Sequence, residues 1–279
     1  MLEIPESHNI AVQLNQTIKG RTIRRVLANS SPHRFAFYFG DPGNYHSLLS
    51  GKAVGEAKAV AGFVEIEVGD TRALFNDGTN IRYFPAGAPI PTKNQLHIEF
   101  EDNSSVVCTV QMYGGLWVYH EGENDNQYYL VAKDKPSPLT DEFDEGYFRQ
   151  LLGSVKQTLS VKAFLATEQR IPGLGNGVLQ DILFYAKANP RCLLEKLTDD
   201  EKSSLLTGIR RTLSRMTAEG GRDTEKDLFG CSGGYETIMC NRKLSHPCPS
   251  CGGTVVKQAY LGGSVYFCLT CQPIEGKAK

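Results

Sequence analysis

Two cysteine pairs near the end of the chain, Cys248-Pro249-Ser250-Cys251 and Cys268-Leu269-Thr270-Cys271, decide how its last part folds. Four thiolates at this spacing suit one tetrahedral Zn²⁺ ion, and the glycine pairs Gly252-Gly253 and Gly262-Gly263 between them suit the turns of a two-stranded ribbon. We therefore predict a structural zinc finger with one ion per chain, held by Cys248, Cys251, Cys268 and Cys271. The alternative is two redox-active or disulfide-bonded pairs, which the lack of a secretory signal disfavours.

Such a site is closed, because four protein ligands leave no open position at which the metal could activate water. Any chemistry of this protein must therefore come from other residues. The chain has 279 residues, of which 41% are hydrophobic, and this length indicates about two domains.

The charge of the chain is distributed unevenly. The formal net charge is −1, but the stretch from Asn241 onward carries five Lys or Arg and one acid. A basic finger on a mildly acidic body predicts modest, salt-sensitive binding to a polyanion. The first residues show neither a signal peptide nor a membrane anchor, so we expect a cytoplasmic protein with no membrane partner.

The first half of the sequence is typical of a β domain with one leading helix. Apolar residues at helical spacing predict a helix from Pro5 to Lys19, which Gly20 ends. Short β-branched or alternating runs then predict strands at 22–27, 35–39, 53–54, 63–68, 96–100 and 105–110. Short strands at regular spacing indicate a sandwich or barrel rather than βαβ units.

The second half is helical. An acidic, proline-containing stretch predicts a linker, and apolar residues at three- and four-residue spacing predict helices at 147–156, 161–167, 178–186 and 199–216. The predicted domains are a β-sandwich at 1–130, a linker at 131–145, a helical domain at 146–240 and the zinc finger at 241–279.

A glycine-rich loop, Arg170-Ile171-Pro172-Gly173-Leu174-Gly175-Asn176-Gly177, joins two of the predicted helices. Gly173 and Gly175 let backbone amides approach a phosphate, and Asn176 stands at a helix N-terminus where its amide can donate to the same anion. A dinucleotide-binding loop would need a preceding strand and a third glycine in register, and both are missing. An interhelical turn without a ligand remains an alternative.

The order of motifs resembles one known family. The stretch Gln169–Asn176, followed by Asp181-Ile182-Leu183-Phe184, is similar to the helix–two-turns–helix element of the formamidopyrimidine-DNA glycosylase and endonuclease VIII family. In that family this element precedes a Cys₄ finger that ends in Cys-Gln, as Cys271-Gln272 does here, and the start Glu3-Ile4-Pro5-Glu6 also matches. The resemblance implies an α+β multidomain fold with an N-terminal β-sandwich, a helix–two-turns–helix domain and a zinc-ribbon finger.

The resemblance also implies a function. Family members bind double-stranded DNA between their domains and flip a damaged base out of the helix. By position, Glu3 is the carboxyl group that assists sugar-ring opening and proton transfer, and Asn176 is a ligand of a backbone phosphate. Lys162 matches a family lysine, and the basic residues Arg242, Lys243 and Lys257 flank the finger as further candidate DNA contacts.

The departures from the family fall where its chemistry lies. The family nucleophile is an N-terminal proline, but position 2 is Leu2, whose amine could attack only if Met1 were removed. A family lysine aligns with Gly62, the residues that fill the void left by the flipped base fall near Tyr113 and Gly114, and the arginine of the finger tip is replaced by Gly263.

Three hypotheses follow from these observations. The first is a monomeric DNA-repair protein that binds damaged DNA and excises a flipped base by hydrolysis, without efficient cleavage of abasic sites. The second is a non-catalytic module that binds damaged DNA or other nucleic acid. The third is a protein or small-ligand binder that no longer acts on DNA, which the near-neutral charge allows.

Overall fold

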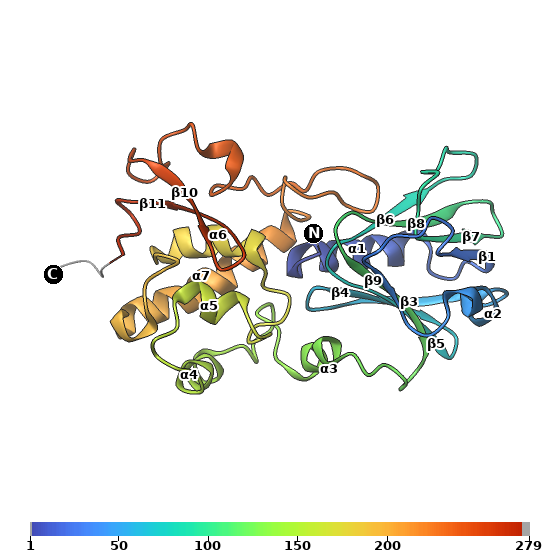
Figure 1. Cartoon of the computed structure of the whole chain (residues 1–279), viewed down its shortest axis with the longest axis horizontal. Coiled ribbons are helices and arrows are strands. Elements are labelled where there is room, and N and C mark those ends of the chain that lie inside the picture. The colour runs from blue at the N-terminus through green and yellow to red at the C-terminus, as the bar shows by residue number, and fades with distance from the viewer. Residues whose placement is uncertain (1, 275–279) are drawn as a thin grey trace. The chain divides into compact units, whose positions relative to one another are not determined.

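The structure is a computed structural model in which residues 2–274 are described. Their helices and strands follow one another along the chain as Figure 1 shows. The chain divides into two compact units. The first unit runs to Lys133 and also contains Glu219–Gly234, whereas the second consists of Asp134–Ala218 and the chain from Tyr235 onward. The division at 130, 146 and 241 that the sequence suggests stays a prediction.

The first unit contains a leading helix, nine strands and shorter helices among the described residues. The helices are α1 (Ile4–Thr17), α2 (Tyr45–Leu49), α3 (Gln127–Asp134) and the 3₁₀ turn η1 (Pro42–Asn44). The strands are β1 (Ile23–Ala28), β2 (Ala36–Tyr38), β3 (Val54–Val60), β4 (Phe63–Val68), β5 (Thr71–Phe75), β6 (Thr79–Phe84), β7 (Leu96–Phe100), β8 (Ser105–Val110) and β9 (Gly114–His120).

These strands form two sheets that enclose one core. The first has the order β1-β7-β8-β6, and the second has the order β2-β9-β5-β4-β3. Alternate residues of a strand face opposite sides, so Val64, Ile66 and Val68 of β4 join the buried core together with residues of α1, which contacts β3 and β4. The predicted β-sandwich with a leading helix is confirmed.

Several elements of this unit were not predicted. The sequence did not predict β5, β6, α2 or α3, nor did it predict β9, whose first two residues are Gly114 and Gly115. In the structure both glycines lie in β9, at positions where any larger residue would clash with its neighbours. A Cβ on Gly114 would lie 2.7 Å from Thr79 Oγ1, and one on Gly115 would lie 2.1 Å from the Trp117 ring, which covers this backbone.

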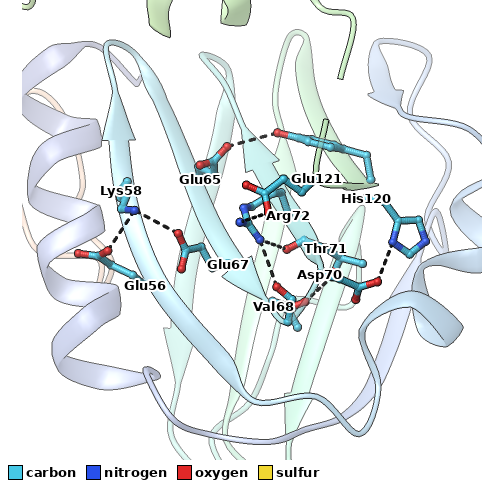
Figure 2. Close-up of polar contacts among 12 residues, drawn as sticks. Glu56, Lys58, Glu65, Glu67, Val68, Asp70, Thr71, Arg72, His120 and Glu121 are labelled. Carbon is cyan, nitrogen blue, oxygen red and sulfur yellow. Dashed lines mark hydrogen bonds and ion pairs between the residues drawn. The ribbon is translucent and has the colours of Figure 1, made fainter. Parts of the chain in front are cut away.

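The outer face of the five-stranded sheet is covered in two different ways. At one end α3 packs on aromatic side chains, and the hydroxyl groups of Tyr119 and Tyr129 both donate to the Glu65 carboxylate. The rest of the face carries exposed ion pairs, shown in Figure 2. On this face Lys58 contacts both Glu56 and Glu67. Arg72 contacts Glu121, and His120 contacts Asp70. Exposed pairs contribute at most about 1 kcal/mol each, so this face is mainly a solvated surface.

The second unit is helical and ends in the zinc-ribbon hairpin. Its elements are α4 (Glu145–Gly153), α5 (Val161–Ala166), α6 (Asn176–Ala186), η2 (Leu194–Lys196), α7 (Asp199–Ala218), η3 (Asn241–Lys243), β10 (Val255–Tyr260) and β11 (Gly263–Cys268). The helix α7 packs closely on α6 at Gly208, where a Cβ would lie 3.1 Å from the Ile182 carbonyl oxygen. The strands β10 and β11 pair in antiparallel fashion, as the spacing of the cysteines predicts.

The four predicted helices of this unit agree with α4 to α7 within two or three residues at each end. Within residues 2–274 the structure contains no helix long and apolar enough to span a membrane.

Candidate functional site

The N-terminus of α1 carries two buried carboxylates, Glu3 and Glu6. Glu3 is the N-cap residue with an extended backbone, and Pro5 lies in the first turn, where its fixed φ suits a helix and its missing N–H costs nothing. Glu6 accepts a hydrogen bond from the Glu3 N–H at 3.3 Å, one half of a capping box. The local sequence therefore fixes the place of Glu3, and the helix dipole favours negative charge there.

Arg222 binds both carboxylates. Its guanidinium Nε and Nη2 donate to Glu6 at 2.9 and 2.8 Å, its Nη1 lies 3.3 Å from Glu3 Oε2, and its backbone N–H donates to Glu6 at 3.1 Å. The exposed fractions of the side chains are 2% for Arg222, 4% for Glu3 and 5% for Glu6. Burial alone lowers the pKa of Arg222, but the charges of Glu3 and Glu6 outweigh it and the pKa is raised. Because a guanidinium is always charged, Glu3 has a permanent cation beside it.

A long loop brings Arg222 to these carboxylates. Its two ends close through glycines: Gly221 has a φ of 95°, and a Cβ on Gly233 would lie 2.2 Å from Gly221. Helix α1 holds the loop, because Asn9 Nδ2 donates to the Gly220 carbonyl at 2.9 Å and Gln13 Nε2 donates to Asp227 at 2.9 Å. Arg222 was not predicted from the sequence, where the preceding pair Gly220-Gly221 is its only local signal.

Leu2 lies in the core of the first unit. Its exposed fraction is 4%, and it belongs to the same buried cluster as Ile10 and Leu14 of α1. The hypothesis that its amine acts as a nucleophile depends on the removal of Met1, which lies outside the described residues. Burial of the Leu2 side chain identifies this residue as an apolar anchor for the start of the chain.

The other departures from the resembled family have defined places. Gly62 follows Ala61, which has a φ of 53°, in the turn between β3 and β4, and Ser7 Oγ donates to the Ala61 carbonyl at 2.5 Å. Tyr113 precedes β9 and is 46% exposed, while its hydroxyl group donates to Asp77 Oδ2 at 3.2 Å. The neighbouring Met112 is 73% exposed and is therefore more accessible than Tyr113.

The predicted phosphate loop lies between α5 and α6. Gly173 has a φ of 75°, Gly175 is the N-cap residue of α6, and Asn176 is the first residue of the helix. Asn176 Nδ2 donates to the Ser264 carbonyl at 3.0 Å, and within residues 2–274 its buried Oδ1 has no hydrogen-bond partner. Because an amide nitrogen carries two hydrogens, Nδ2 can keep this bond and still donate to an anion.

Lys162 is buried, with an exposed fraction of 3%. Its Nζ donates to the Tyr260 carbonyl at the end of β10 at 2.6 Å, and burial lowers its pKa. This geometry gives Lys162 a role in holding the zinc-ribbon hairpin on α5. Direct contact of Lys162 with DNA stays a prediction.

The four predicted ligand cysteines come together at one end of the hairpin. Their sulfur atoms all lie within 4.8 Å of one another. A backbone hydrogen bond closes the turn that carries Cys248 and Cys251. The Gly252 N–H donates to the Cys248 carbonyl at 2.8 Å, and Gly252 has a φ of 72°. Gln272 joins the cluster to the helices, because its amide donates to the Ala188 carbonyl at 2.9 Å and accepts from Cys268 N–H at 3.0 Å. Four soft donors at these separations fit a tetrahedral metal site.

The basic residues near the finger are partly engaged. Lys243 pairs with Glu236 at 2.5 Å, and Lys257 Nζ donates to Asn241 Oδ1 at 3.2 Å. Gly263 lies beside the phosphate loop, because a Cβ there would lie 3.3 Å from Asn176 Nδ2. The position where a family arginine was expected is therefore adjacent to the predicted phosphate ligand.

Comparison with known proteins finds formamidopyrimidine-DNA glycosylases that are similar to this chain over nearly its whole length. No protein-family profile matches the chain. The formamidopyrimidine-DNA glycosylase of Lactobacillus delbrueckii subsp. bulgaricus is 27% identical over 98% of this chain and 99% of its own, and that of Wolbachia pipientis subsp. Culex pipiens is 28% identical over 98% and 100%.

Solved structures agree in fold. The Lactococcus lactis Fpg in complex with abasic-site DNA superposes with a TM-score of 0.84 at 24% identity and covers 97% of this chain and 99% of its own. The MutM (Fpg) protein of Thermus thermophilus gives a TM-score of 0.79 at 24% identity, with 97% and 98% covered.

Proposed function

Because this chain belongs to the formamidopyrimidine-DNA glycosylase and endonuclease VIII family, we propose that it is a DNA-repair glycosylase that binds damaged double-stranded DNA and excises a damaged base by hydrolysis. The observation that carries this proposal is the pairing of Glu3 with the buried Arg222. A buried, ionised carboxylate at a helix N-terminus is a suitable general base and a suitable counter-charge for a cationic sugar.

In the proposed reaction, Glu3 takes a proton from water as the water oxygen bonds to the sugar C1′. The N-glycosidic bond breaks, and its electron pair leaves with the base. The negative charge of Glu3 stabilises the positive charge that develops on the sugar ring. Arg222 does not touch the substrate in this scheme, and it is a positioning residue that keeps Glu3 ionised and fixed.

We expect no efficient cleavage of abasic sites. That chemistry requires an amine that forms a Schiff base with the opened sugar, and the burial of Leu2 gives its side chain a packing role. Reduction with borohydride during incubation with abasic-site DNA should therefore trap little covalent complex. Efficient trapping would show that an amine of this chain is a competent nucleophile.

We assign phosphate binding to the loop of Gly173, Gly175 and Asn176, with Arg242, Lys243 and Lys257 as further DNA contacts. The Cys₄ cluster would hold one Zn²⁺ ion, whose binding stabilises the fold of the hairpin. With all positions taken by thiolates, the ion has no direct part in base excision. We expect the protein to act as a monomer.

The test is base release from duplexes that each carry one damaged base. The wild type should release at least one lesion, and Glu3→Gln should slow release by about a hundredfold or more while DNA binding persists. Glu56→Gln is the matched control, because it changes an exposed carboxylate of β3 in the same unit. Lesion binding without release by the wild type would instead identify a non-catalytic binding module.

A further inference from the structure

The turn between β5 and β6 is fixed against the start of β9 by backbone packing. Asn76 Oδ1 accepts from the Gly115 N–H at 2.6 Å, and Thr79 Oγ1 donates to the Gly115 carbonyl at 3.1 Å. Gly78 has a φ of 86°, and a Cβ there would lie 1.7 Å from the Tyr113 carbonyl oxygen. Asp77 is therefore held opposite Tyr113 by rigid main-chain contacts.

Asp77 and Tyr113 form a hydrogen-bonded pair in which Asp77 is the buried residue and Tyr113 is the exposed one. The Tyr113 hydroxyl donates to Asp77 Oδ2 at 3.2 Å, whereas the buried Asp77 Oδ1 has no hydrogen-bond partner within the part of the chain that the structure describes. Tyr113 is 46% exposed. A substrate can thus touch the hydroxyl group of Tyr113, with the carboxyl group of Asp77 behind it.

Burial raises the pKa of the Asp77 carboxyl above its usual range, and the charge of Glu225 raises it further. The positive charge of the chain N-terminus and hydrogen bonds from the Tyr113 hydroxyl and the Gly78 N–H oppose this shift without cancelling it. The pKa of Tyr113 is raised by the charge of Asp77, by burial and by the charge of Glu3. Tyr113 therefore stays a neutral hydroxyl, and it lies close enough to Glu3 to be influenced by that carboxylate.

The two carboxyl groups have opposite environments. Glu3 is paired with Arg222, whereas no ion pair with Lys or Arg is found for Asp77 among residues 2–274. When the environments of two acids push their pKa values apart, the acid that stays ionised suits the role of base and the acid that stays protonated suits the role of general acid. Base excision requires both, because the departing base leaves with an electron pair that must be protonated.

We propose that Asp77 and Tyr113 form a proton relay that protonates the departing base, a role that rests on the proposed glycosylase function. When Asp77 is protonated, its carboxyl group becomes the donor in the hydrogen bond with Tyr113, and the Tyr113 hydroxyl turns its own proton toward a nitrogen or oxygen of the base. As the C1′–N bond breaks, the Tyr113 proton moves to the base and the Asp77 proton moves to the Tyr113 oxygen. Glu3 takes one proton from the attacking water. The products are the free base and an abasic sugar, and transfer of a proton from Glu3 to Asp77 through solvent restores the enzyme.

The relay is tested with Tyr113→Phe and Asp77→Asn in single-turnover base release measured against pH. Each variant should slow release by about a hundredfold with unchanged affinity for lesion DNA. Wild-type release should fall as pH rises through the raised pKa of Asp77, because the relay needs the protonated form, and this decline should vanish in Asp77→Asn. Tyr128→Phe and Asp102→Asn are the matched controls, since both change exposed residues of the same unit.

The fluorescence of Trp117, the single tryptophan of the chain, shows whether a variant is folded. It therefore distinguishes loss of the relay from loss of activity through unfolding. A raised folded-state pKa means that the carboxylate form of Asp77 destabilises the fold at high pH, so Asp77→Asn should unfold no more easily than the wild type at about pH 8.

Three results would overturn the relay. If both variants release base at the wild-type rate and with the wild-type pH profile while Glu3→Gln does not, the pair only stabilises the turn and the glycosylase function stands. If the wild type releases no base from any lesion, the proposed function and the relay both fail. Release that is slowed without any change in pH profile would also contradict proton transfer.

Discussion

Replacement of Arg222 by methionine should be among the most destabilising changes in the first unit. The variant leaves Glu3 and Glu6 buried without their cation and removes the ion contacts that the guanidinium makes with both. Loss of one partner from a buried ion pair costs about 3–5 kcal/mol, a large share of the roughly 5–15 kcal/mol that stabilises a typical domain.

The assay is urea unfolding followed by the fluorescence of Trp117, which reports on the first unit alone because the chain has one tryptophan. The control is Arg24→Met, which breaks the exposed pair with Glu99 at 2.5 Å and should cost no more than about 1 kcal/mol. Protonation would neutralise the orphaned carboxylates, so the loss for Arg222→Met should be smaller at about pH 5 than at about pH 8.

Similar losses in the free energy of unfolding for Arg222→Met and Arg24→Met would contradict a buried ion pair, and so would a loss for Arg222→Met that does not depend on pH. A double variant, Arg222→Met with Glu6→Leu, should recover part of the stability, because it removes a buried charge together with its partner. No recovery would show that Arg222 acts mainly through its contacts with the rest of the loop.

Three further predictions concern the anchor and the finger. Leu2→Ala should lower the free energy of unfolding of the first unit by about 2–4 kcal/mol, measured by the same fluorescence assay, because Leu2 is 4% exposed in the core. The purified protein should contain one zinc per chain by elemental analysis. Chelation of the metal or the change Cys268→Ser should increase proteolysis of the hairpin. The control Cys231→Ser, which lies outside the cluster, should be cleaved like the wild type. Gly263→Arg should strengthen DNA binding and steepen the slope of log binding constant against log salt concentration by about one unit. Gly263→Ala is the control for crowding against Asn176. An unchanged slope would mean that position 263 does not meet a phosphate.

Local patterns predicted the elements whose stability depends on near neighbours. Strands β4, β7 and β8 begin and end where the alternation of apolar residues placed them, and the helices α4 to α7 follow their apolar spacing. The cysteine cluster was predicted in full, because two short Cys-x-x-Cys turns and one hairpin are enough to assemble it. Strand β9 was missed for the opposite reason, because glycine inside a strand is explained here only by Thr79, which is distant in sequence, and by the Trp117 ring.

Local sequence patterns are enough to predict the leading helix, strands β4, β7 and β8 and the cysteine cluster, because apolar periodicity and short-range thiol spacing are local properties. The surroundings of the two carboxyl groups depend on contacts that are distant in sequence. Arg222 is 216 positions from Glu6, and Asp77 meets Tyr113 across 36 positions. Burial and charge pairing set the protonation of a carboxyl group, and both depend on the side chains that folding brings around it. No local pattern could therefore show that Glu3 has a cation beside it while Asp77 has a tyrosine hydroxyl.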